Sequence, residues 1–160
     1  MSSVFFSYSH ADEALRDDLE KHLSQLKREG AISTWHDRRI APGGDLGAKI
    51  DAELDRADLV LLLVSSDFLA SEYCYSKEMT RALERHRVGN CRVLPVILRP
   101  CDWQSSPFGG LLALPTDGKP VTRWKDNDEA FLDVVKGIRT ILAAKPGIIQ
   151  RETAPASRSL

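Results

Sequence analysis

The chain has 160 residues, enough for one domain with a buried core, and it carries 22 Lys and Arg against 23 Asp and Glu. This balance leaves no basic excess for nucleic acid and no charge block for a membrane surface, so we expect neither partner. The N-terminus lacks the pattern of a signal peptide, and the longest apolar run, 59–64, is far shorter than a membrane span.

The cysteines point to a reducing compartment. Cys74, Cys91 and Cys101 are odd in number and show no CxxC spacing, which argues against a disulfide framework and against a zinc site. We therefore expect free thiols, no bound metal and a cytoplasmic location.

Hydrophobic patterning divides the chain into alternating strands and helices. Apolar runs predict strands at 4–7, 32–36, 59–64, 93–98 and 121–122. Helical spacing of apolar residues predicts helices at 11–28, 46–54, 71–87 and 129–143, with Gly30 ending the first and a further short helix near Leu111. Ser71 is a plausible N-cap for the helix that ends at Arg87.

This alternation is typical of a parallel sheet, because parallel strands need crossover helices. We predict a flavodoxin-like α/β fold, with a five-stranded parallel sheet of order 2-1-3-4-5 flanked by helices. Residues 1–145 would form this domain. Residues 146–160, rich in Pro, Gly, Ser, Arg and Thr, would be a flexible tail or a linker to a sensor domain or partner.

The predicted topology also indicates where a ligand would bind. In a sheet of this order a crevice opens at the carboxyl ends of strands one and three. Ser7-Tyr8-Ser9 follow strand one and Ser65-Ser66-Asp67 follow strand three, while Asp37 and Pro42-Gly43-Gly44 follow strand two. We expect these segments to line or cover the crevice.

Glu78 is the most informative acidic residue. The apolar positions of its predicted helix, Tyr75, Met79, Ala82, Leu83 and His86, form one stripe, and Glu78 lies at the edge of that stripe. Partial burial there would raise the pKa of a carboxylate unless a cation compensates. An alternative interpretation, which spacing alone favours, is a surface ion pair between Glu78 and Arg81.

In this order the motifs resemble those of the TIR (Toll/interleukin receptor-type) domain family. The resemblance covers roughly residues 3–143, and the motif sequences are more similar to those of prokaryotic members than to those of animal receptor domains. It rests on five stretches: 4–9, Asp37 with 42–44, 59–66, 71–79, and Arg99-Pro100-Cys101-Asp102-Trp103.

The resemblance implies an activity. Many TIR domains cleave the nicotinamide–ribose bond of NAD+, giving ADP-ribose or a cyclic form, often as immune or anti-phage effectors activated by self-association. Their catalytic residue is a glutamate in an aromatic-Cys-x-x-Glu stretch, which Glu78 matches, although Tyr73-Cys74 stands one residue further away here. NAD+ would be the substrate, with no other cofactor.

The same resemblance suggests which residues contact the substrate. These would be Tyr8, Ser9, Asp37, Arg38, Gly44, Leu46, Cys74 and Tyr75. Trp103 would flank the crevice or serve as a half-buried packing residue.

Three other functions remain open. The domain could be a non-enzymatic adaptor that only makes TIR–TIR contacts, with Ile40 and Pro42 on its binding surface. A phosphoacceptor receiver domain shares the topology, but it needs an acidic pair where Ser7-Tyr8-Ser9 stand. A nucleoside-processing enzyme of similar fold is the third.

Overall fold

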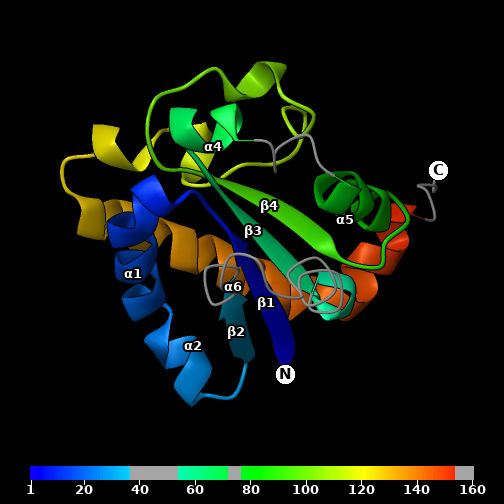
Figure 1. Ribbon diagram of the computed structural model, residues 1–160. Coiled ribbons are helices and arrows are strands. Elements are labelled where there is room, and N and C mark those ends of the chain that lie inside the picture. The colour runs from blue at the N-terminus through cyan, green and yellow to red at the C-terminus, as the bar shows by residue number, and fades with distance from the viewer. Residues whose placement is uncertain (37–53, 72–76, 154–160) are drawn as a thin grey trace, which may run out of the picture.

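The computed structural model of the protein describes residues 1–36, 54–71 and 77–153 (Figure 1), and for 35, 36, 78 and 145–153 it describes the backbone alone. Within these residues no helix is both long enough and apolar enough to cross a membrane.

The centre of the fold is a parallel sheet of four strands in the order β2-β1-β3-β4. The strands are β1 (Ser2–Ser7), β2 (Ile32–His36), β3 (Leu59–Val64) and β4 (Arg92–Ile97). Every residue of β3 is buried, as expected of a central strand covered on both faces. The sequence predicted these strands and their order; β2 and β3 begin and end where it placed them.

The predicted fifth strand at 121–122 is wrong, because η6 (Val121–Arg123), a 3-10 helix, occupies those residues. A single parallel bridge between Val96 and Leu114 stands beside β4 instead. The Leu114 amide donates to Pro95 O at 2.9 Å and Ile97 N donates to Leu114 O at 2.8 Å. Pro115 follows directly and has no amide hydrogen to continue the ladder.

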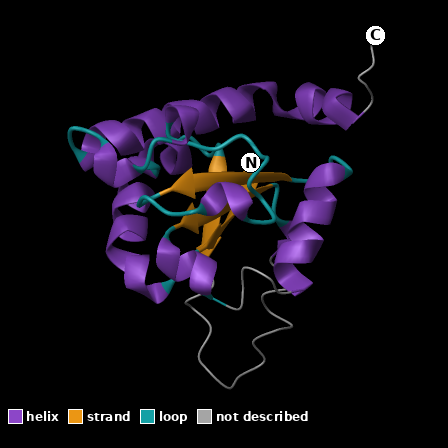
Figure 2. Cartoon of the chain, turned by 90° about the horizontal axis from the view of Figure 1, so that it is seen from above, coloured by secondary structure: helices purple, strands orange, loops and turns teal. Residues whose placement is uncertain are grey.

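Helices cover both faces of the sheet. One face carries η1 (His10–Asp12), α1 (Glu13–His22), α2 (Ser24–Arg28) and α6 (Asn127–Thr153). The other carries α4 (Ser66–Ala70) and α5 (Lys77–Arg87). Figure 2 shows the strands between the long helix α6 and α5. The core is accordingly split into two clusters, one against α1 and α6 and one against α4 and α5.

Several helix boundaries differ from the sequence prediction. The first helix is divided at Leu23, and α4 was not expected. No helix forms near Leu111; the short helix of this region is η4 (Trp103–Ser105), followed by η5 (Thr116–Gly118). Helix α6 continues past Pro146 to Thr153 instead of ending at Ala143. The division of the chain at residue 145 stays a prediction.

The first helical segment ends as its sequence predicts. Gly30 adopts φ +77°, the left-handed conformation that favours glycine after a helix. The Ala31 amide then donates to Leu26 O at 2.9 Å, which turns the chain into β2.

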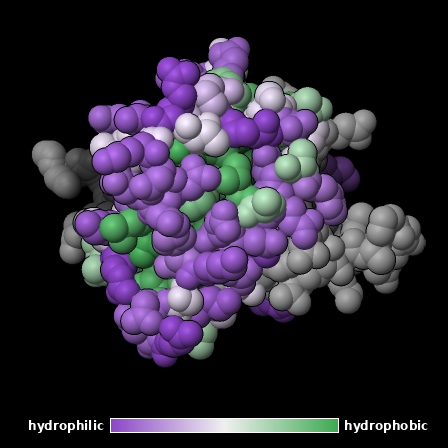
Figure 3. All heavy atoms as spheres, turned by 90° about the vertical axis from the view of Figure 1, so that its left-hand side faces the viewer, coloured by the Kyte–Doolittle hydropathy of each residue, from purple (hydrophilic) through white to green (hydrophobic). Residues whose placement is uncertain are grey.

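The surface over α1 and α2 is largely hydrophilic, with small apolar areas between the polar side chains (Figure 3).

Candidate functional site

The carboxyl ends of β1 and β3 open into two short helices, each begun by a serine. Ser9 accepts a hydrogen bond from Ala11 N at 3.2 Å and caps η1. Ser65 accepts one from Phe68 N at 3.2 Å and caps α4. The hydroxyls that the sequence placed after these strands therefore satisfy helix amides in the structure.

An ionic cluster joins the ends of three strands at this edge. Asp12, at the end of η1, accepts hydrogen bonds from Arg99 Nε at 3.1 Å and Nη2 at 2.8 Å, and also one from the Ser65 hydroxyl. Arg99 Nη2 donates in addition to Asp67 Oδ2 at 2.6 Å. The hydrogen bond to Asp67, more than any other contact, raises the pKa of Arg99, and burial opposes it.

This cluster was not predicted from the sequence. Asp12 and Arg99 are 87 positions apart, so no local spacing relates them. One signal was present: each comes shortly after the carboxyl end of a predicted strand, and such ends meet at one edge of a parallel sheet.

Tyr8, predicted to line the pocket, is a core residue. It is buried in the cluster that contains α1 and α6, on the face of the sheet away from α5. The guanidinium carbon of Arg16 lies 5.6 Å from the centre of the Tyr8 ring and 5.6 Å from the centre of the Phe6 ring. Both distances are within the range of cation–π attraction. Arg16 is itself buried and paired with Asp17 and Glu20.

Ser7 presents a different environment at the end of the same strand. Its side chain is fully buried, and its hydroxyl has no hydrogen-bond partner among the described residues. Because side chains alternate along a strand, Ser7 shares the face of Phe5, which belongs to the cluster under α4 and α5. Ser7 therefore lies on the side of the sheet that carries Glu78.

Helix α5 presents the expected stripe to the sheet. Met79 and Ala82 are buried, and Leu83 and His86 are half-buried. His86 Nδ1 accepts a hydrogen bond from Val93 N at 2.9 Å, which ties the helix to β4. Arg81, the alternative partner for Glu78, lies 3.8 Å from the Asp55 carboxylate.

The other predicted site residues cannot be located in the same way. Glu78 belongs to the first turn of α5 as a backbone position, and its side chain lies outside the described part of the protein. Six other predicted substrate contacts also lie outside the described residues: Asp37, Arg38, Gly44, Leu46, Cys74 and Tyr75. The same holds for Ile40 and Pro42 of the predicted adaptor surface. Their roles stay predictions.

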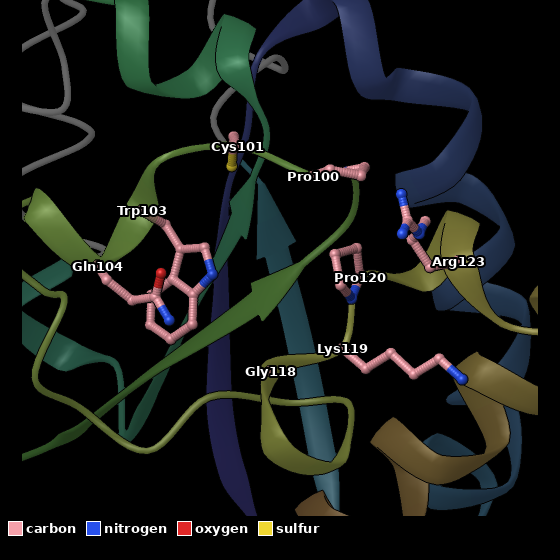
Figure 4. A pocket seen from close by; sticks show the side chains of 8 residues that line it. All are labelled: Pro100, Cys101, Trp103, Gln104, Gly118, Lys119, Pro120 and Arg123. Carbon is pink, nitrogen blue, oxygen red and sulfur yellow. The ribbon is translucent and has the colours of Figure 1, made fainter.

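An open cleft of about 570 Å³ follows β4. Figure 4 shows the Trp103 indole on one side and the Pro120 ring on the other, with Arg123 directed toward Pro100. Trp103 is half-buried and packs against the core. Trp103 therefore serves as a packing residue and also lines this cleft.

Two cysteines are described, and both are free thiols, Cys91 buried and Cys101 half-buried. Among the described residues no three His, Cys, Asp or Glu side chains gather into a group that could hold a metal ion.

Comparisons with known proteins identify the family. A family model described as "TIR domain" matches residues 4–133. Because this match covers most of the chain, the protein belongs to the TIR domain family.

Two curated relatives were found. The chain is 57% identical over 159 residues to "Uncharacterized protein y4lF" of Sinorhizobium fredii, covering 99% of this chain and 48% of the relative. It is 27% identical over 103 residues to Toll-like receptor 4 of Pinctada imbricata, covering 62% of this chain and 12% of the receptor. The chain thus spans about half or less of the length of these relatives.

Solved structures share the fold. The TIR domain of the Toll-related receptor TRR-2 from Hydra magnipapillata superimposes with a TM-score of 0.58 at 20% identity, covering 87% of this chain and 99% of that one. A prokaryotic SEFIR domain gives 0.52 at 18% identity, covering 91% and 95%. At these identities the likeness concerns the fold alone.

Proposed function

We propose that the protein is an NAD+ nucleosidase that cleaves the nicotinamide–ribose bond, with Glu78 as its catalytic residue. The observation that carries the proposal is the sequence position of Glu78 within a TIR domain. It falls in the first turn of α5, one residue before buried Met79 and four before buried Ala82.

The topology of the fold supports a site at this end of α5. Helix α5 follows β3 and α4 and precedes β4, so its first turn comes after the chain has left the sheet at the edge formed by the carboxyl ends of the strands. That edge is where ligands bind in open α/β sheets. Met79 and Ala82 are buried on the helix face next to position 78, and a carboxylate at the edge of such a face would be partly desolvated.

The chemistry of the bond explains how one carboxylate suffices. Ordinary glycosidases need a general acid because they must protonate a leaving alkoxide. In NAD+ the leaving group is a cationic pyridinium, which departs as neutral nicotinamide without a proton. The carboxylate of Glu78 would stabilise the positive charge that develops on the ribose, and could then accept a proton from the attacking water.

Other residues would hold the rest of NAD+. The proposed contacts are Ser9, Asp37, Arg38, Gly44, Leu46, Cys74 and Tyr75. Of the two residues after β1, we propose Ser9 rather than Tyr8 as a contact, because the Tyr8 side chain is buried on the face of the sheet opposite α5.

The decisive experiment compares two substitutions on one helix. Glu78→Gln removes the proposed catalytic charge, whereas Glu84→Gln removes an exposed carboxylate that pairs with Arg87 at 2.5 Å. We expect Glu78→Gln to lower nicotinamide release about 10²-fold or more. Glu84→Gln should leave it unchanged. Equal activity of the Glu78 variant and the parent would remove Glu78 from the mechanism.

Self-association is the proposed trigger, as part of an immune or anti-phage response. Nicotinamide release per protein molecule should then rise with protein concentration and in a forced oligomer. Chromatography of the products would distinguish ADP-ribose from its cyclic form. A forced oligomer that releases no nicotinamide would refute the enzymatic proposal.

A non-enzymatic signalling module is the second candidate. It is favoured by the sequence likeness to one curated relative, which is a Toll-like receptor. The parent would then assemble without consuming NAD+. Loss of assembly in Pro42→Ala, without any NAD+ turnover in the parent, would support this candidate.

A further inference from the structure

Arg99 bridges two carboxylates that come from different segments at the edge of the sheet. Asp12 belongs to the turn after β1 and Asp67 to the first turn of α4 after β3, while Arg99 itself follows β4. One guanidinium therefore ties together the three segments that leave β1, β3 and β4.

The two ends of the bridge are unequal. The Asp12 side chain is 1% exposed, Arg99 is 35% exposed and Asp67 is 50% exposed. A buried carboxylate needs a nearby cation or hydrogen-bond donors, so Asp12 holds Arg99 in one place. Arg99, once fixed, is a rigid and planar donor for the more exposed Asp67.

Helix α4 is attached to the same carboxylate a second time. The hydroxyl of Ser65 donates to Asp12 and accepts from Phe68 N. A helix of five residues has too few internal hydrogen bonds to persist by itself. Its position is therefore set by these two polar ties and by the buried ring of Phe68.

The position of α4 limits where α5 can begin. The chain between Ser71 and Lys77 can span at most about 20 Å. We propose that Arg99 is a positioning residue: by bridging Asp12 and Asp67 it holds α4 in place, and α4 in turn restricts the position of the end of α5 that bears Glu78. This inference rests on the proposed NAD+ cleavage, because it assigns Arg99 a part in that reaction.

Arg99→Lys tests the proposal without unpairing Asp12. Lysine keeps the positive charge, but its single ammonium cannot present two nitrogens to Asp12 while also reaching Asp67. Misplacing a catalytic group by about 1 Å can cost up to 10²-fold in rate. We expect kcat for nicotinamide release to fall about tenfold with KM within about twofold of the parent.

Arg139→Lys is the matched control. Arg139 also donates two hydrogen bonds to one carboxylate, Glu29, at 3.1 and 2.9 Å, and its side chain is 43% exposed. The same substitution there should leave kcat and KM unchanged. An equal loss of kcat in both variants, an unchanged kcat in Arg99→Lys, or a rise in KM alone would overturn the proposal.

Hydrogen exchange provides a readout that does not need activity. In Arg99→Lys the amides of α4 and of the first turn of α5 should exchange faster than in the parent and in Arg139→Lys. Unchanged exchange would refute the positioning role. If the parent releases no nicotinamide, the proposed function fails, and the exchange result alone still decides whether Arg99 holds α4 and α5 in place.

Discussion

The indole ring of Trp103 lies against the backbone of Gly118, so closely that a β-carbon at position 118 would be 2.8 Å from Cζ2 of the ring. Gly118 also adopts φ +71°, a conformation that residues with side chains rarely occupy. This contact fixes the indole at the side of the cleft that follows β4 (Figure 4).

Gly118→Ala should therefore destabilise the protein by about 2 kcal/mol, from the left-handed backbone and the overlap with the indole. Chemical denaturation would measure the loss. Gly110→Ala is the control, because a β-carbon there meets nothing within 4 Å. If Gly118→Ala costs the same in a Trp103→Ala background, the ring contact contributes nothing.

The Asp12–Arg99–Asp67 cluster predicts unequal effects on stability. Arg99→Met leaves the buried Asp12 carboxylate without its cation and should cost about 3 kcal/mol. Asp67→Asn removes only a solvent-exposed partner and should cost less than about 1 kcal/mol. Urea titrations of the two variants at pH 7 would compare the free energies of unfolding. Similar losses would show that burial of Asp12 does not govern the cluster.

Glu20 should make stability depend on acid pH. Burial acts to raise the pKa of its carboxyl, but hydrogen bonds and charge from Lys27 and Arg16 outweigh it and lower that pKa to about 2. A lowered pKa stabilises the fold above the ordinary value of 4.5. That contribution disappears as the pH falls through about 2.

Glu20→Gln is the corresponding variant. At pH 6 it should be less stable than the parent by about 1–2 kcal/mol, because solvent screens part of the interaction. The difference should shrink as the pH is lowered from about 5 toward 2, which urea midpoints across that range would record. A difference that stays constant with pH would contradict the assignment.

The two described cysteines should differ in reactivity. Burial raises the pKa of the Cys91 thiol to about 11, which leaves about one thiolate in a thousand at pH 8. Burial also raises the pKa of Cys101, but Arg99 opposes it, and this residue lines the open cleft. Maleimide labelling followed by peptide mapping should modify Cys101 at least about tenfold faster than Cys91. As a control, the two thiols should be labelled at equal rates once the protein is unfolded. Equal labelling rates in the folded protein would contradict the predicted difference in reactivity.

Local pattern was sufficient for most of the framework. The continuous apolar run Leu59–Val64 is β3, buried throughout, and Ile32–His36 is β2. The stripe on α5 follows the predicted spacing at Met79 and Ala82. These features depend on the period of the backbone and on neighbouring residues, both of which a sequence displays directly.

Other features depended on partners far away in the chain. Val121 and Thr122 read as a short strand, yet the bridge beside β4 forms at Leu114, and Pro115 directly after it cannot continue the ladder. Tyr8 reads as a pocket residue, but its ring packs on the face opposite α5 and against Arg16. In both cases contacts with residues far away in the chain decided the outcome.

By itself, then, the amino-acid sequence determined the alternating elements and the parallel order of the sheet's four strands, because hydrophobic period and crossover topology are properties of the chain order. The edge at which a ligand binds stays a prediction. The tertiary structure alone decided that Asp12, Ser65, Asp67 and Arg99 meet at that edge. A buried carboxylate takes the cation that the fold brings to it, and nothing in the spacing of these residues along the chain specifies which one that is.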